Sequence, residues 1–248
     1  MFLLALVFGI IPGLFWLYFY LQEDANPEPK RLIFKAFIFG ILGACAALGI
    51  QLLIVNNFPN LSLDSLLFNN KSQFIDIGWI VITLVLMALI EEVFKFGSAF
   101  FAIHKNKQFD EPIDAMIYSL TASIGFATLE NIGVLLDPLE KLSTIQNTAV
   151  QGTVISSALA MLSFRFVGAT LLHALMGAII GYFWALSIRE FGKRSLILKG
   201  VIYATLLHAV FNYLILIYGG TYVEPILFLL VLGFFVLNDF DKLKNKKI

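Results

Sequence analysis

The stretch "IGWIVITLVLMALIEEVFKFGSAFFA", residues 77–102, is apolar over most of its length but carries Glu91, Glu92 and Lys95. It is long enough to cross a bilayer as a helix, which takes about 20 residues. A charged side chain near the centre of such a helix costs about 2.5–3.5 kcal/mol to insert. The three charges therefore have to face the interior of a helix bundle, pair with one another, or change protonation.

The whole chain has the composition of a membrane protein. Of its 248 residues, 59% are hydrophobic and 14% are charged, and the mean hydropathy is +0.87. A soluble domain of this length would carry far more charge. We predict an all-α, polytopic transmembrane helical bundle that forms a single membrane-embedded domain over residues 1–248. The net charge of zero gives no indication of nucleic-acid binding, and the lone Cys45 excludes an intramolecular disulfide.

Apolar length predicts seven spans, at about residues 2–21, 32–55, 77–102, 115–136, 165–187, 197–218 and 222–238. The first is interpreted as a retained helix, because it lacks the basic start and the cleavage site of a signal peptide. The stretch "TAVQGTVISSALAML", residues 148–162, is open to two interpretations. It is either a re-entrant or interfacial helix or an eighth span, and an eighth span would reverse the side on which the chain ends.

Basic residues gather in alternate connections. They are Lys30 and Arg31, then Lys105 and Lys107, then Arg189, Lys193 and Arg194, and last the basic tail at 239–248. Because cytoplasmic loops are enriched in Lys and Arg, seven spans predict an N-terminus outside and a C-terminus in the cytoplasm.

The spacing of the charges in the third span indicates chemistry. Lys95 lies one helical turn after both Glu91 and Glu92, so all three share one face. One lysine neutralises only one glutamate, which leaves the second carboxyl in a low dielectric beside a like charge. A carboxyl held near neutrality suits general acid–base catalysis. The alternative is an ion pair that only locks helix packing.

Three further polar sites lie in apolar spans. The small residues one turn either side of His173 predict a close approach of helices there. A rise of about 1.5 Å per residue brings the three sites and the Glu–Lys motif to compatible depths in the membrane, so we expect one shared cavity. The sites are Glu130 and Asn131 in "GFATLENIG", His173 in "GATLLHALMGAIIG", and His208 and Asn212 in "ATLLHAVFNYLI".

This set of residues suits two kinds of peptide-bond hydrolysis inside a membrane. In one, a glutamate activates water while histidine and asparagine donors stabilise the oxyanion. In the other, Glu130, His173 and His208 hold Zn²⁺, which supplies hydroxide near neutral pH. A proton-coupled transporter or channel is the alternative that is not an enzyme. Against it, the sequence has no repeat halves and no pair of Gly/Pro-broken helices.

Four motifs resemble a known family. "EEVFK" resembles the E-E-x-x-K motif of the PrsW family of membrane proteases, and "FATLEN" resembles its F-x-x-x-E-N motif. His173 and "HAVFN" follow in the order of that family. The resemblance covers about residues 79–217, which indicates a protease core at 77–218 and leaves the two N-terminal spans at 1–76 outside it. Type II prenyl-protein (CAAX) proteases are more distantly similar, but they usually have Arg one position after Lys95 and His in place of Glu130.

The resemblance implies a multi-pass endopeptidase of the bacterial cytoplasmic membrane that cuts membrane-anchored proteins. The best-known role of the family is the first cut of an anti-sigma factor. The family is often described as metallopeptidases, whereas its relatives are also argued to be metal-independent glutamate proteases. Carried over by motif, Glu91 and Glu92 provide the base and Lys95 is their partner. The other candidates are Glu130, His173 and His208 as catalytic or metal-binding residues, and Asn131 and Asn212 as polar support or oxyanion donors.

Overall fold

A computed structural model describes residues 2–63, 77–144, 148–189, 192–218 and 223–244, and every long element in these ranges is an α-helix. Seven stretches are long and apolar enough to cross a membrane, with α6 and α7 counted as one. The prediction of an all-α bundle with seven spans is therefore confirmed. The helices are α1 (Phe2–Leu21), α2 (Lys30–Asn57), α4 (Ile77–Ile103), α5 (Pro112–Thr144), α6 (Thr148–Val167), α7 (Ala169–Arg189), α8 (Arg194–Ile217) and α9 (Val223–Lys244), with a short 3₁₀ turn, η1 (Pro59–Leu61).

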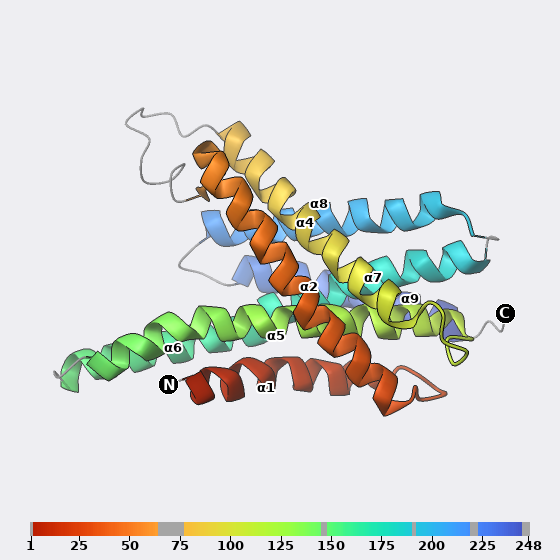
Figure 1. Cartoon of the computed structure of the whole chain (residues 1–248), viewed down its shortest axis with the longest axis horizontal. Helices are drawn as coiled ribbons and strands as arrows, with labels where there is room; N and C mark the ends of the chain where they lie inside the picture. Colours follow the sequence, from red (N-terminus) through yellow and green to blue (C-terminus); the bar gives the residue numbers. More distant parts are fainter. Residues whose placement is uncertain (1, 64–76, 145–147, 190–191, 219–222, 245–248) are drawn as a thin grey trace.

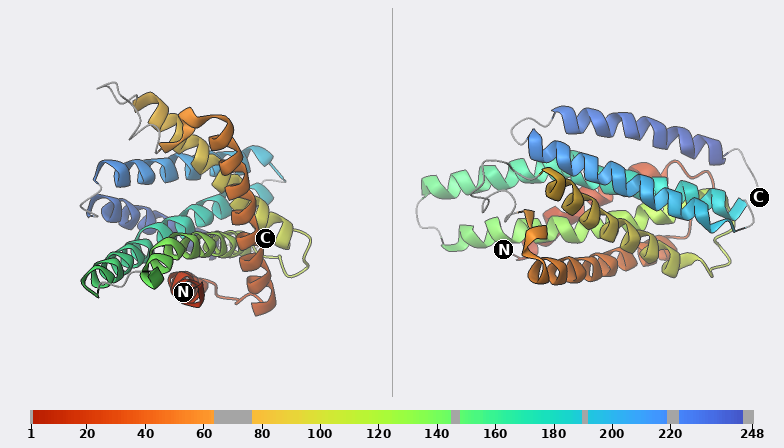
Figure 2. Two further views of the ribbon diagram at one scale, coloured as in Figure 1. Left: turned by 60° about the vertical axis from the view of Figure 1, so that its left-hand side comes forward. Right: turned by 90° about the horizontal axis from the view of Figure 1, so that it is seen from above.

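Helix α5 is the central element of the bundle. Residues 113–128 are all buried, and α1, α2 and α7 pack around them (Figure 1). Apart from Asp114 and Tyr118, the side chains of this segment are apolar or small, and two of its hydroxyls are satisfied within the helix. The hydroxyls of Thr121 and Thr128 donate to the carbonyl oxygens of Ile117 and Ile124, one turn earlier. Helices α2 and α4 cross α5 obliquely, as Figures 1 and 2 show.

Small residues bring α7 directly against α5. A Cβ placed on Gly181 would lie 2.5 Å from the carbonyl oxygen of Ala115, and one on Gly177 would collide with the side chain of Ser123. Such a gap admits glycine and no larger residue. The close approach expected around His173 is therefore present, and it sets the distance between His173 on α7 and the facing residues of α5.

Residues 148–162 add no eighth span, because the stretch from Val150 is counted with α7 as one of the seven. They belong to α6, which lies beside the end of α5 and passes at Gly168 into α7. The apolar stretch Val150–Arg189 has 40 residues, which is about 60 Å of helix, twice the ~30 Å hydrocarbon core. Helix α5 also runs to Thr144, beyond the predicted end near 136. Hydropathy indicates where contact with lipid ends, whereas a helix continues as long as its backbone hydrogen bonds do.

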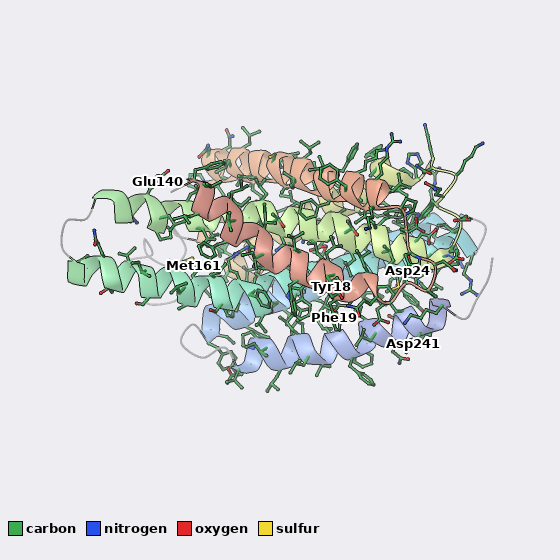
Figure 3. The ribbon with its side chains drawn as sticks, turned by 90° about the horizontal axis from the view of Figure 1, so that it is seen from below. Tyr18, Phe19, Asp24, Glu140, Met161 and Asp241 are labelled. Atoms are coloured by element: carbon green, nitrogen blue, oxygen red, sulfur yellow. The ribbon has the colours of Figure 1, made fainter. Side chains whose placement is uncertain are left out.

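One end of the bundle gathers the connections after α1 and α4. Asn26 Nδ2 donates to Glu111 Oε1 at 2.8 Å, and Lys244 at the end of α9 forms an ion pair with Glu23. Figure 3 shows Asp24 and Asp241 at this end and Glu140 at the opposite one. Two of the basic connections thus lie on the same side as the end of α9, as the alternation of charge requires. The tail after Lys244 is outside the described residues.

Candidate active site

The acidic pair of α4 is split into two environments. Glu92 and Lys95 are fully buried, and Lys95 Nζ donates to Glu92 Oε1 at 2.7 Å. Glu91 Oε2 is 3.8 Å from the same nitrogen. Lys95 Nζ also lies 5.1 Å from the ring centroid of Phe126 on α5, where the aromatic face stabilises a cation. Lys95 therefore neutralises Glu92 first and leaves Glu91 weakly paired.

Helix α8 contributes the first imidazole. His208 Nδ1 is 2.6 Å from Glu92 Oε1, and its Nε2 is 3.7 Å from Glu91 Oε2. His208 is only 3% exposed. A carboxylate on one ring nitrogen fixes the orientation of the ring and directs the other nitrogen at a ligand. Here the other nitrogen is the one nearer to Glu91.

The second imidazole comes from α7 and is paired with α5. His173 Nε2 lies 2.9 Å from Glu130 Oε2, and its ring stacks on Phe126 with centroids 5.9 Å apart. The rings of His173 and His208 meet edge to face at 5.3 Å. Four helices thus supply two carboxylate–imidazole pairs, Glu92–His208 and Glu130–His173, which meet at Glu91.

The two candidate asparagines differ. Asn131 is fully buried, and its Nδ2 donates to Thr170 Oγ1 at 3.0 Å. Asn212 is one turn from His208, yet its side chain makes no hydrogen bond with the cluster among the residues that the structure describes.

Two residues of the site were not predicted. Gln51 on α2 donates from Nε2 to Glu91 Oε1 at 3.1 Å. Arg165 on α6 donates from Nε to Asn131 Oδ1 at 2.6 Å and lies 3.3 Å from Glu130 Oε2. Both are polar residues within apolar runs, so the same criterion that selected Glu91 would have found them.

Glu91, His173 and His208 form a group that fits a metal ion. Each offers one ligand atom, and these atoms lie within 4.8 Å of one another. Within the described ranges, Glu91 Oε2 and His173 Nδ1 are buried without a hydrogen-bond partner. Such orphaned acceptors are costly unless a water or an ion satisfies them. The group differs from the predicted metal set in having Glu91 where Glu130 was expected, because Glu130 is used as the hydrogen-bond partner of His173.

Several known bacterial proteins are similar in sequence to this chain. Protease PrsW of Geobacillus kaustophilus is 28% identical over 210 residues, which are 84% of this chain and 78% of that protein. Protease PrsW of Oceanobacillus iheyensis is 29% identical, over 84% of this chain and 80% of its own. Protease PrsW of Clostridioides difficile is 25% identical, over 99% and 92%. No solved structure matches significantly.

The fold and the site define a multi-pass helical membrane protein with carboxylates and imidazoles gathered in its interior. The sequence pattern of the PrsW family of intramembrane metalloproteases matches residues 28–238. This chain belongs to that family, and it is a membrane protease.

Proposed function

We propose that the protein hydrolyses peptide bonds of membrane-anchored proteins at the group formed by Glu91, His173 and His208. The observation that supports this most directly is the meeting of two carboxylate–imidazole pairs at a third, weakly paired carboxylate. An ion pair that served packing alone would need only Glu92 and Lys95. Burying the additional acidic and imidazole groups costs free energy, and a catalytic role accounts for their presence.

Glu91 is the general base in this proposal. Its Oε1 is held by Gln51, while its Oε2 is buried without a partner in the described part of the chain. That free oxygen is suited to accept a proton from a water molecule. Glu92 Oε2 also has no partner among the described residues, but we assign Glu92 a positioning role because its Oε1 is held by both Lys95 and His208. Glu130 positions His173 in the same way.

The reaction follows from this assignment. Glu91 takes a proton from water as the water oxygen forms a bond to the scissile carbonyl carbon, and amide N–H groups of the site stabilise the oxyanion. The C–N bond then breaks, and the proton on Glu91 passes to the leaving amine nitrogen. Water enters as one reactant, and a carboxyl and an amine leave as products.

In a second form of the proposal, Glu91, His173 and His208 hold Zn²⁺, and Glu91 is a ligand in place of acting as the base. A carboxylate and two imidazoles with an open position are a common ligand set of catalytic zinc. Bound there, the ion would lower the pKa of a water ligand and polarise the carbonyl. Glu92 and Glu130 would then act as the carboxylates that orient metal-bound imidazoles.

We further propose that the enzyme resides in a bacterial cytoplasmic membrane with its N-terminus outside, and that its substrate is a single-span protein such as an anti-sigma factor. The alternation of basic connections and the organisms of the relatives support the location. The substrate rests on the resemblance of the motifs to the family.

The test uses purified protein in lipid vesicles with a panel of single-span membrane proteins that includes anti-sigma factors. We expect a specific cleavage that Glu91→Gln lowers at least about 100-fold while the melting temperature holds or rises, since Gln keeps the shape and removes a buried charge. Elemental analysis and chelator treatment of the same preparation test for zinc. Full cleavage by both Glu91→Gln and Glu92→Gln would refute the mechanism, and ion flux without any proteolysis would favour a transporter.

A further inference from the structure

A groove leads from the surface of the bundle to the candidate active site. It has a volume of about 360 Å³ and lies between α2 and α5, with Arg165 of α6 on its wall. Leu48 and Val134 lie along it and are 52% and 36% exposed, so it opens on the outer surface of the helices. In a membrane-spanning bundle that surface faces lipid.

The groove is continuous with the residues that carry the chemistry. Gln51, Glu130 and Arg165 line it. Gln51 also donates to Glu91, and Glu130 also contacts His173. A molecule in the groove is therefore in contact with the direct neighbours of Glu91 and His173.

The polarity of the wall indicates what the groove holds. The side chains of Glu130 and Arg165 are 29% and 17% exposed. A charged group facing hydrocarbon is costly, and an acyl chain offers it no hydrogen bond. An extended peptide in a membrane, by contrast, needs hydrogen-bonding groups around it, because its backbone N–H and C=O groups lack partners. Glu130 supplies an acceptor, and Gln51 and Arg165 supply donors.

Gly133 leaves space for a substrate side chain. It lies on the groove and is exposed, and a Cβ placed on it would meet no atom within 4 Å. Unlike Gly177, this glycine is not required by helix packing. Its lack of a side chain widens the groove one turn from Glu130.

We propose that the groove between α2 and α5 binds an unwound, extended segment of the substrate's transmembrane polypeptide, with an apolar side chain in the space beside Gly133. This inference rests on the proposed function, since it specifies how the peptide bond reaches Glu91.

Gly133→Leu tests the groove. The Cβ of Leu meets no atom within 4 Å there, and Leu favours a helix over Gly, so we expect the fold to be retained. Gly233→Leu on α9 is the matched control, because its Cβ also meets nothing and it is remote from the groove. On the substrate that the unaltered protein cleaves, we expect Gly133→Leu to raise KM about tenfold with little change in kcat, as when binding is removed and the chemistry is kept. The control should match the unaltered enzyme.

Disulfide crosslinking is a second test of the groove, and it does not depend on proteolytic activity. Cys45 is the single cysteine, so Gly133→Cys in a Cys45→Ala chain carries one thiol on the groove, and Gly233→Cys carries one outside it. We expect Gly133→Cys alone to crosslink to single-span proteins that carry single cysteines along the transmembrane segment. If Gly133→Leu fails to fold, the crosslinking result alone tests whether the groove binds the substrate.

The outcomes separate the two proposals. An unchanged KM in folded Gly133→Leu overturns the groove assignment, and points to a lipid as its occupant, while leaving the protease activity in place. Equal crosslinking by Gly233→Cys also overturns it. Failure of the unaltered enzyme to cleave any member of the panel instead contradicts the proposed function.

Discussion

At the scale of residues, the structure assigns different surroundings to two adjacent glutamates. Glu92 accepts from Lys95 and contacts His208, whereas Glu91 lies 3.1 Å from Gln51 Nε2 and 3.8 Å from Lys95 Nζ. A single turn of helix thus holds one carboxylate that is neutralised and one that is kept available. The cation is shared unequally because Lys95 lies closer to Glu92.

Lys95 is the residue whose loss should harm stability most. Lys95→Met keeps much of the volume of the side chain but leaves Glu92 buried without its cation. Removing one partner of a buried pair costs about 3–5 kcal/mol. We expect a lower melting temperature in detergent and lower expression. The control is the double variant Lys95→Met with Glu92→Gln, which should recover part of the loss. A melting temperature equal to that of the unaltered protein would show that the pair contributes little.

At the scale of elements, the contact of α5 with α7 sets the geometry of the site. The collision between a Cβ on Gly177 and Ser123 means that any larger residue pushes α7 away from α5. His173, one turn away on the same face, would then separate from Glu130.

Gly177→Val should therefore destabilise the bundle and impair cleavage together. Overpacking of an interior costs about 1–3 kcal/mol. Gly152→Val on α6 is the matched control, since its Cβ meets no atom within 4 Å. Thermal melting and the cleavage assay check both effects. Normal cleavage by Gly177→Val would mean that His173 does not need its present distance from α5.

The connection between α1 and α2 should make stability depend on pH. Asp24 is 5% exposed, and its burial raises the pKa of its carboxyl. Repulsion from Glu111 raises this pKa further, whereas hydrogen bonds from the backbone of Asn26 and Glu28 lower it in part. Burial likewise raises the pKa of Glu28, whose carboxylate accepts from the Tyr118 hydroxyl. The folded state thus retains protons that the unfolded chain releases above about pH 4.

Because the folded-state pKa is raised, the contribution of Asp24 is complete at low pH and is lost as the pH rises through the folded pKa. We expect Asp24→Asn to flatten the fall of the melting temperature between about pH 4 and 7. Melting curves across this range measure it, with Asp241→Asn on the exposed end of α9 as the control. A steeper fall in Asp24→Asn would contradict the assigned direction.

At the scale of the whole molecule, the charge pattern and the fold agree on which connections share a side. The ion pair of Lys244 with Glu23 and the hydrogen bond of Asn26 with Glu111 join the basic connections at one end. We expect a reporter fused after Ile248 to lie in the cytoplasm and one before Met1 to lie outside. An alkaline phosphatase fusion at the C-terminus should be inactive and a fluorescent protein fusion bright. The reverse result would invert the proposed orientation.

The sequence by itself determined the class of fold, because about 20 apolar residues have no stable place except a membrane or a core. It also selected Glu91, Glu92, Lys95, Glu130, His173 and His208, since polar side chains are costly in hydrocarbon and mark functional sites there. Their roles stay predictions. It did not decide whether residues 148–162 form a separate helix or continue a neighbouring span. A long helix that extends beyond its span has the same local hydropathy as a separate short helix.

Only the tertiary structure decided how these residues pair. Glu130 binds His173, Glu91 joins the two imidazoles, and Gln51 and Arg165 complete the site. These pairings depend on how four or more helices are rotated and how they cross. Glycines at the helix contacts determine this geometry, and they act between segments far apart in the sequence, which no local pattern encodes. The groove beside Gly133 has the same origin, since a glycine that permits packing and one that leaves a space open are identical in sequence.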